Sequence, residues 1–144
     1  MIRKAEIKDL PTLATLALEL WPDNTAEAMQ ADLKSILEKE DAAFFLAFAQ
    51  DAPAGFAQCG LRRDYVEGTE TSPVGYLEGV YVKPNYRRQG LAKSLLTACE
   101  AWARQQDCLE FASDCELANT ESLAFHLHMG FLEANRIICF TKKL

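Results

Sequence analysis

The segment from Val80 to Leu96, VYVKPNYRRQGLAKSLL, carries residue types that can bind an anion. An apolar run stops at Pro84, passes two arginines and Gly90, and continues as an amphipathic helix. A helix that starts after such a joint has unpaired backbone N–H groups at the positive end of its dipole. The segment therefore predicts a phosphate-binding helix N-terminus. The alternative is an ordinary helix start with a solvated basic patch.

Composition and charge restrict the class of protein. The chain has 144 residues, 49% apolar and 25% charged, which is typical of one globular domain spanning residues 1–144. Its net charge of −6 disfavours a nucleic-acid partner and permits a cationic substrate without requiring one. No apolar run reaches the ~20 residues of a membrane span. The charged start MIRKAEIKDL lacks the apolar segment of a secretory signal, so we expect a cytoplasmic protein with no membrane partner.

Cysteines and histidines form no metal-binding pattern. His126 and His128 lie two positions apart in a helical stretch, so they point to different faces and no metal is expected. The odd number of cysteines, without a C-x-x-C pair, suits a reducing compartment. We expect all of them to be small buried hydrophobic residues: Cys59, Cys99, Cys108, Cys115 and Cys139.

Apolar periodicity predicts a mixed α/β (α+β) chain built on one sheet. Strands are expected at residues 2–7, 43–50, 55–63, 76–82 and 108–114, with one or two more in 131–144. Helices are expected at residues 10–21, 25–37, 90–106 and 119–130.

Several local signals mark the expected boundaries. Asp9, Asn24 or Thr25, and Asn119 are predicted to cap helices, and Gly130 to end one. The residues DAPA, 51–54, are predicted to form the turn of a β-hairpin, and residues 64–75 a polar loop.

Two motifs resemble those of the GNAT superfamily of N-acetyltransferases. RRQGLA at residues 87–92 fits the R/Q-x-x-G-x-G/A signature, which follows a strand in that family. Asn119, with His126 seven residues later and then Gly130-Phe131, fits a second signature. The resemblance implies a twisted, mostly antiparallel sheet that is splayed into a V between two central strands and flanked by about four helices. It also implies acetyl-CoA as co-substrate, bound in the gap of the V.

The resemblance further implies a set of acetyl-CoA contacts. The pyrophosphate is expected on backbone amides, and the pantetheine arm is expected to add a strand beside the sheet. Asn119 is expected to reach the pantetheine, or only to cap its helix. The expected pyrophosphate contacts are Arg88, Gln89, Gly90, Leu91, Ala92 and Lys93. The expected pantetheine contacts from the strand are Val80, Tyr81 and Val82.

A finer resemblance is to the short, dimeric aminoglycoside 6'-N-acetyltransferases. It rests on LWP at residues 20–22, RRDYVEGTETSPVGYLEGVYV at 62–82 and EFASD at 110–114. It implies a small polycationic amine as acceptor and a homodimer formed by exchange of the C-terminal strand. Alternatives are acetylation of a polyamine or a protein amine, or a catalytically idle acyl-CoA sensor. The presence of both Glu78 and Asp114 argues against the sensor.

Two residues are catalytic candidates. Direct transfer needs an uncharged amine, and Glu78 is the candidate that removes its proton through a water, or it only binds the cationic sugar. His126 stands where many acetyltransferases have tyrosine, and it either donates a proton to the leaving thiolate or packs against the thiol. A backbone N–H near Val80 or Tyr81 is expected to hold the oxyanion.

An acidic cleft with aromatic walls is the expected acceptor site. Its candidate residues are Trp21, Asn24, Tyr65, Glu78, Asp114 and Asn135. Asn135 is expected to come from the partner subunit, and it replaces an acid expected in close relatives. The aromatic residues and Asp114 have the alternative roles of core and cap. No cysteine falls where an acyl-cysteine is expected, which favours direct transfer in a ternary complex.

Overall fold

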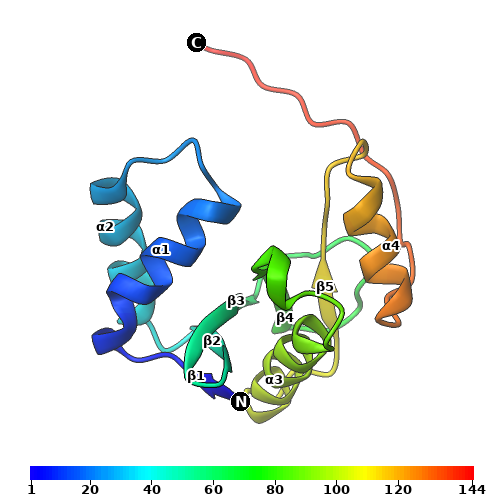
Figure 1. Ribbon diagram of the computed structural model, residues 1–144. Helices are drawn as coiled ribbons and strands as arrows, with labels where there is room; N and C mark the ends of the chain where they lie inside the picture. Colours follow the sequence, from blue (N-terminus) through cyan, green and yellow to red (C-terminus); the bar gives the residue numbers. More distant parts are fainter.

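A five-stranded sheet in the order β1-β2-β3-β4-β5 organises the computed structural model, which describes residues 1–144 (Figure 1). The strands are β1 (Ile2–Lys4), β2 (Ala42–Ala49), β3 (Ala52–Arg62), β4 (Val74–Val82) and β5 (Phe111–Ser113). The helices are α1 (Leu10–Leu20), α2 (Ala26–Leu37), α3 (Leu91–Gln105) and α4 (Thr120–His128), with short 3-10 turns η1 (Ile7–Asp9) and η2 (Pro84–Tyr86). Neighbours from β1 to β4 are antiparallel and β4–β5 is parallel, which confirms the predicted fold class.

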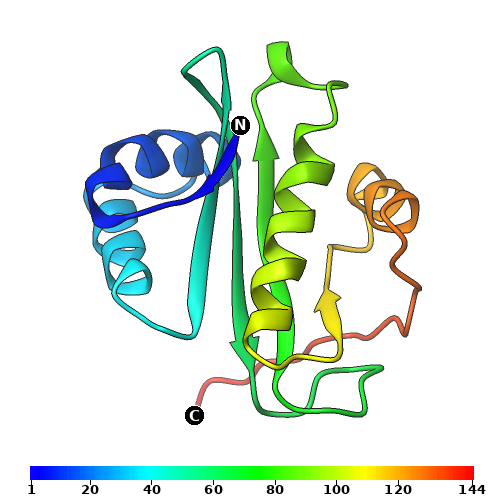
Figure 2. The same cartoon turned by 90° about the horizontal axis from the view of Figure 1, so that it is seen from below.

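The helices cover both faces of the sheet. Figure 2 shows α1 and α2 on one face and α3 on the other. Successive residues of β2 point to opposite faces, so Phe44 joins the apolar cluster of Leu13 in α1, and Phe45 joins that of Leu95 in α3. The two resulting cores hold the central strands in place between the helical layers.

The last strand pairs with only part of its neighbour. β5 pairs in parallel with Gly75–Leu77, the first half of β4. From Glu78 to Val82, β4 has no strand on this side, and Figure 2 shows β5 ending well before β4 does. The exposed strand edge is the opening that the predicted V requires. Because no strand follows β5 in the chain, the opening lies at an edge of this sheet rather than between two central strands.

The hairpin turn between β2 and β3 differs from the prediction. Gln50 (φ 49°) and Asp51 (φ 69°) form the turn, and Pro53 lies within β3 opposite Phe48. Two consecutive residues with positive φ match the tight turn whose twist suits a hairpin. The predicted DAPA turn is therefore displaced toward the N-terminus.

The polar loop before β4 is also shifted. Val74 is buried and pairs with Arg62, so β4 starts within the segment 64–75 that was predicted to be loop. The apolar side chain of Val74 and its pairing explain why the strand extends in this direction.

Helix caps are predicted correctly for two helices and wrongly for one. Thr25 accepts from the N–H of Ala28 at the start of α2, and Asn119 caps α4. Asp9 precedes α1 but makes no side-chain cap there. Its carboxylate instead accepts two 2.8 Å hydrogen bonds from Arg3 and one from the backbone of Glu6. The bonds from Arg3 lower the pKa of Asp9 to about 2.

The C-terminal segment contains none of the predicted strands. No helix or strand follows α4, and Figure 1 shows the end of the chain extending away from the sheet. A strand needs a pairing edge, and residues 131–144 pair with none in the single chain. The segment exposes a series of large apolar side chains: Leu132, Ile137, Ile138, Phe140 and Leu144.

Three of the five cysteines are buried as predicted. Cys59, Cys99 and Cys108 lie in the core beside α3, and all five are free thiols. The neighbouring Cys59 thiol, together with burial, raises the pKa of Cys99. Cys115 and Cys139 are exposed, contrary to the prediction, because they lie in the segments after β5 and α4 that the core does not cover.

Candidate active site

A β-bulge in β4 places Glu78 at the point where β5 ends. Gln58 of β3 pairs with Gly79, and the next residue, Cys59, pairs with Leu77, so Glu78 is an extra residue in β4. Bulges redirect a side chain and occur often beside active sites. The Glu78 side chain is 35% exposed and lies at the start of the unpaired part of β4.

An arginine contacts this carboxylate. Arg62, at the end of β3, places Nη2 3.0 and 3.2 Å from the two carboxylate oxygens of Glu78. Its guanidinium also lies over the ring of Tyr76, 3.4 Å from the centroid. Arg62 and Tyr76 were not among the predicted site residues, because the sequence does not reveal the bulge or the register that bring them to Glu78.

Tyr76 connects the arginine to the second predicted acid. Its hydroxyl donates a hydrogen bond to Asp114, which directly follows β5. Burial raises the pKa of the Tyr76 phenol, and the bond to Asp114 raises it further, so the phenol is the donor and Asp114 the acceptor. The contacts therefore run from Glu78 through Arg62 and Tyr76 to Asp114. We call these four residues the acid cluster.

Trp21 packs against β4 at Gly79, the residue after Glu78. An added Cβ at Gly79 would lie 2.8 Å from Cζ2 of Trp21, so the indole lies directly against β4 beside Glu78. The indole is also edge-on to Phe56 at 5.9 Å, which fixes its orientation. Asn24 is exposed nearby and donates to the carbonyl of Trp21 at 3.3 Å.

The other two predicted acceptor contacts lie near the polar loop. Tyr65 is 75% exposed, and its hydroxyl accepts from the N–H of Gly68. Asn135 donates to Glu67 at 3.0 Å. Neither residue hydrogen-bonds to Glu78 or Asp114, so the single chain does not bring them into the acid cluster.

The loop before α3 has the backbone shape expected of an anion site. Arg88 (φ 62°) and Gly90 (φ 79°) are left-handed, and Gly90 precedes α3 without any side-chain cap. An added Cβ at Gly90 would meet nothing within 4 Å, so the space outside the helix start is open. Arg87 instead turns back, and its Nε donates to the carbonyl of Val82 at 2.8 Å.

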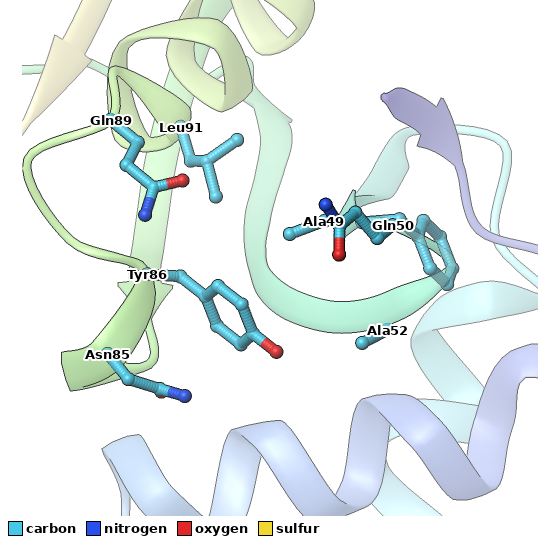
Figure 3. Close-up of a pocket in the computed structure, with 8 residues that line it drawn as sticks. Ala49, Gln50, Ala52, Asn85, Tyr86, Gln89 and Leu91 are labelled. Atoms are coloured by element: carbon cyan, nitrogen blue, oxygen red, sulfur yellow. The ribbon is translucent and has the colours of Figure 1, made fainter.

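A pocket of about 520 Å³ lies between this loop and the β2–β3 turn (Figure 3). Gln89 and Leu91 line one side, with Tyr86 pointing into the space and Gln50 opposite (Figure 3). Its lining includes neither Glu78 nor any other member of the acid cluster. The pocket therefore borders the predicted pyrophosphate segment and is separate from the acids.

His126 is held at both ring nitrogens. Nδ1 lies 2.6 Å from the carbonyl oxygen of Ser122, and Nε2 lies 2.8 Å from Oγ of Ser113. Ser113 ends β5, and its hydroxyl also lies 3.2 Å from the carbonyl of Leu77. The histidine is thus connected to the vertex where β4 and β5 separate. Asn119 caps the same helix by accepting from the N–H of Ser122 at 3.1 Å.

Comparison with protein families decides the classification. The model of the acetyltransferase (GNAT) family matches residues 9–131. The chain belongs to the GNAT family. RRQGLA lies between β4 and the first turn of α3, which is the position that the GNAT signature predicts.

Individual GNAT relatives match over nearly the whole chain. An aminoglycoside N(6')-acetyltransferase type 1 of Acinetobacter haemolyticus is 39% identical over 99% of this chain and 98% of that protein. An aminoglycoside N(6')-acetyltransferase type 1 of Stenotrophomonas maltophilia is 40% identical over 99% of this chain and 93% of that protein. The structure of AAC(6')-Iy in complex with the bisubstrate analogue CoA-S-monomethyl-acetylneamine has a TM-score of 0.96 and 38% identity, covering 100% of this chain and 98% of that one.

Two further observations concern sites of other kinds. The GNAT chain brings together no group of three or more His, Cys, Asp or Glu side chains suited to a metal ion. None of its helices combines the length and apolar character needed to span a membrane.

Proposed function

We propose that the chain transfers the acetyl group of acetyl-CoA to the 6'-amino group of aminoglycosides, by direct attack within a ternary complex, and so confers resistance to them. The observation that carries the proposal is similarity over the full length, in sequence and in structure, to enzymes named for this reaction. The acid cluster supports it independently, because two carboxylates beside an aromatic wall suit a polycationic sugar.

Acetyl-CoA fits the opening along β4 and the start of α3. The backbone N–H groups of residues 88–93 bind the pyrophosphate, where the left-handed Gly90 leaves open space. The pantetheine arm runs beside Val80 to Val82 as an added strand. The carbonyl of Val82 already accepts from Arg87, so the contacts to pantetheine concentrate on Val80 and Tyr81. Asn119 contributes from the N-terminus of α4.

Glu78 prepares the amine for attack. An ammonium group has no lone pair, so a proton must leave before the nitrogen can attack the thioester carbonyl. The bulge projects the Glu78 carboxylate at the end of the paired part of β4, next to the acetyl position in this proposal. Glu78 accepts the proton through a water. The N–H of Val80 or Tyr81 stabilises the oxyanion that forms.

His126 supplies a proton to the departing CoA thiolate. Because Nδ1 faces the carbonyl of Ser122, it keeps its proton and donates to that oxygen, and the proton for the thiolate is the second proton of the imidazolium, on Nε2 beside the hydroxyl of Ser113. Its transfer leaves a neutral ring that is protonated at Nδ1. The route to the thiolate therefore starts from the Nε2 side, at the vertex of the two strands. A thiol with an ordinary pKa of about 8.5 needs this help only modestly near neutral pH.

The acceptor lies between the acid cluster and Trp21. Glu78 and Asp114 bind its ammonium groups, and the indole of Trp21 forms the wall beside them. Asn24 and Tyr65, both exposed, add further contacts to the acceptor in this proposal.

A second copy of the chain completes the site. The exposed apolar residues of 131–144 need a pairing edge, and exchange of this segment between two copies provides one. Exchange carries Asn135 to the partner's acceptor site. Its amide provides a weaker contact to an ammonium group than an acid does. Analytical ultracentrifugation tests the dimer, and a monomer at micromolar concentration would contradict it.

The five free thiols support a reducing, cytoplasmic location, where acetyl-CoA is made available. No metal is required for the proposed steps, since proton transfer and backbone amides supply the chemistry.

CoA-thiol release from acetyl-CoA tests the function directly. The acceptors are a 6'-amino aminoglycoside, its 6'-hydroxyl counterpart and spermidine, each assayed in parallel. Turnover with the 6'-amino drug alone is expected. Turnover with spermidine alone would reassign the enzyme to polyamines, and no turnover despite acetyl-CoA binding would indicate a sensor. Expression in a susceptible bacterium should raise the inhibitory concentration of the 6'-amino drug only.

A further inference from the structure

Arg62 sits among the acids of a site that receives a cation. One nitrogen of its guanidinium contacts both oxygens of Glu78, at 3.0 and 3.2 Å. A cation in this place reduces the net negative charge that attracts the substrate. Its presence therefore calls for a role other than substrate attraction.

Folding stability does not provide that role. The side chains of Arg62 and Glu78 are 44% and 35% exposed, and ion pairs this exposed contribute little to stability. What the pair does provide is a fixed geometry. The guanidinium carbon lies over Tyr76, 3.4 Å from the ring centroid, and Tyr76 is only 6% exposed. The guanidinium of Arg62 thus packs against a buried aromatic ring.

The same ring holds the second acid. The Tyr76 hydroxyl donates to Asp114, so one side chain is in contact with both Arg62 and Asp114. Asp114 lies outside regular structure, directly after β5, and Glu78 is the extra residue of a bulge. Strand pairing alone therefore does not fix the orientation of either carboxylate.

We propose that Arg62 and Tyr76 are positioning residues, Arg62 orienting the Glu78 carboxylate for proton removal and Tyr76 orienting Asp114 for acceptor binding. The inference rests on the proposed function, since it assigns Arg62 a part in proton removal only through Glu78. It predicts different kinetic signatures for the two residues.

Replacing Arg62 tests the first half. In Arg62→Met, kcat should fall about tenfold, as expected when a catalytic group loses its orientation. KM for the aminoglycoside should stay unchanged or fall, because the site loses a positive charge. Arg62→Lys, which keeps the charge without a flat group to stack on Tyr76, should give an intermediate kcat. An unchanged kcat in Arg62→Met would overturn the proposal.

A double-mutant cycle separates this proposal from the function itself. If Arg62 acts through Glu78, adding Arg62→Met to Glu78→Gln should cause no further fall in kcat. A further tenfold fall would overturn the positioning role. Full activity in Glu78→Gln would instead contradict the proposed role of Glu78. Arg63→Met is the matched control, because the exposed Arg63 side chain forms its ion pair with Asp41, at 3.7 Å, outside the acid cluster, and the variant should keep wild-type kinetics.

Tyr76→Phe tests the second half. The variant keeps the ring under Arg62 and removes only the hydroxyl that contacts Asp114. KM for the aminoglycoside should rise about fivefold with kcat nearly unchanged, the sign of lost binding rather than lost chemistry. An unchanged KM, with acetyl-CoA affinity as the check on folding, would overturn this half.

Discussion

The loop before α3 and the acid cluster are built in different ways. In the loop, the groups that we propose to bind the ligand are backbone amides, and the backbone there is shaped by the left-handed residues Arg88 and Gly90. In the acid cluster, side chains from separate strands contact one another, with Arg62 from β3 and Tyr76 from β4. A backbone site keeps its shape through most side-chain changes, whereas a side-chain site changes with each substitution. The first therefore suits a constant co-substrate and the second a variable acceptor.

The largest effect on activity is expected from Glu78→Gln, which changes the acid cluster. It should lower kcat/KM by about 10², as is typical for loss of a general base, with little change in KM for acetyl-CoA. Steady-state kinetics with both substrates measure this. Glu38→Gln, at an exposed acid after α2, is the control. A rise in aminoglycoside KM alone would mean that Glu78 binds without catalysing.

Gly90→Ala changes the backbone of the loop before α3. An alanine at φ 79° is strained by about 1–2 kcal/mol, and relief of that strain moves the amides. Affinity for acetyl-CoA should fall about tenfold by calorimetry, which corresponds to 1.4 kcal/mol. Gly130→Ala is the matched control, because Gly130 has φ 93° and equally open space. Gly130→Ala should lose a similar free energy of unfolding and bind acetyl-CoA with wild-type affinity. Equal affinities of the two variants for acetyl-CoA would contradict the proposed backbone site.

Gly79→Ala tests the aromatic wall of the acceptor site. The added methyl overlaps Trp21, so we expect a loss of about 1–3 kcal/mol in unfolding free energy and a rise of a few-fold in aminoglycoside KM. Urea unfolding of the variant, of Trp21→Leu and of the double variant measures the coupling. The double variant should be more stable than the sum of the single losses. Strict additivity would show that the two residues do not clash.

Asp9→Asn should leave activity unchanged, because this acid–arginine pair lies outside both sites. Bonds from Arg3 lower the pKa of Asp9 from 3.8 to about 2, and its side chain is 10% exposed. The pair should stabilise the fold by about 2 kcal/mol at neutral pH. The stabilisation is complete above pH 4 and is lost as the pH falls toward 2.

Urea unfolding at a series of pH values checks this prediction. The stability difference between the wild type and Asp9→Asn should shrink between pH 4 and pH 2. Glu6→Gln, at an exposed acid paired with Lys8, serves as the comparison and should have little effect at any pH. A difference that stays constant down to pH 2 would contradict the lowered pKa.

The features predicted from the sequence are those whose causes are local. The joint before α3, the cap at Thr25 and the cap at Asn119 each depend on a few consecutive residues, and the structure has all three. The fold class followed from periodicity and from the family motifs. Glu78 and Asp114 were predicted as a pair, and the structure connects them.

The features that the sequence did not predict depend on distant residues. Arg62 reaches Glu78 only because of the register of β3 on β4 and the bulge. Asp9 was predicted to be a cap, but Arg3 lies close enough to take its carboxylate. The strands predicted in residues 131–144 need a pairing edge that the single chain does not offer. In each case the outcome depends on a partner that is not a neighbour in sequence.

The close approach of Trp21 to Gly79 constrains how the enzyme can evolve. While the indole is present, a side chain at position 79 overlaps it, so a single substitution there lowers the stability of the fold. A smaller residue at position 21 removes that overlap, so position 79 varies most easily after position 21 has changed. The order of mutations, and not only their identity, then determines which acceptors descendants of this enzyme can acquire.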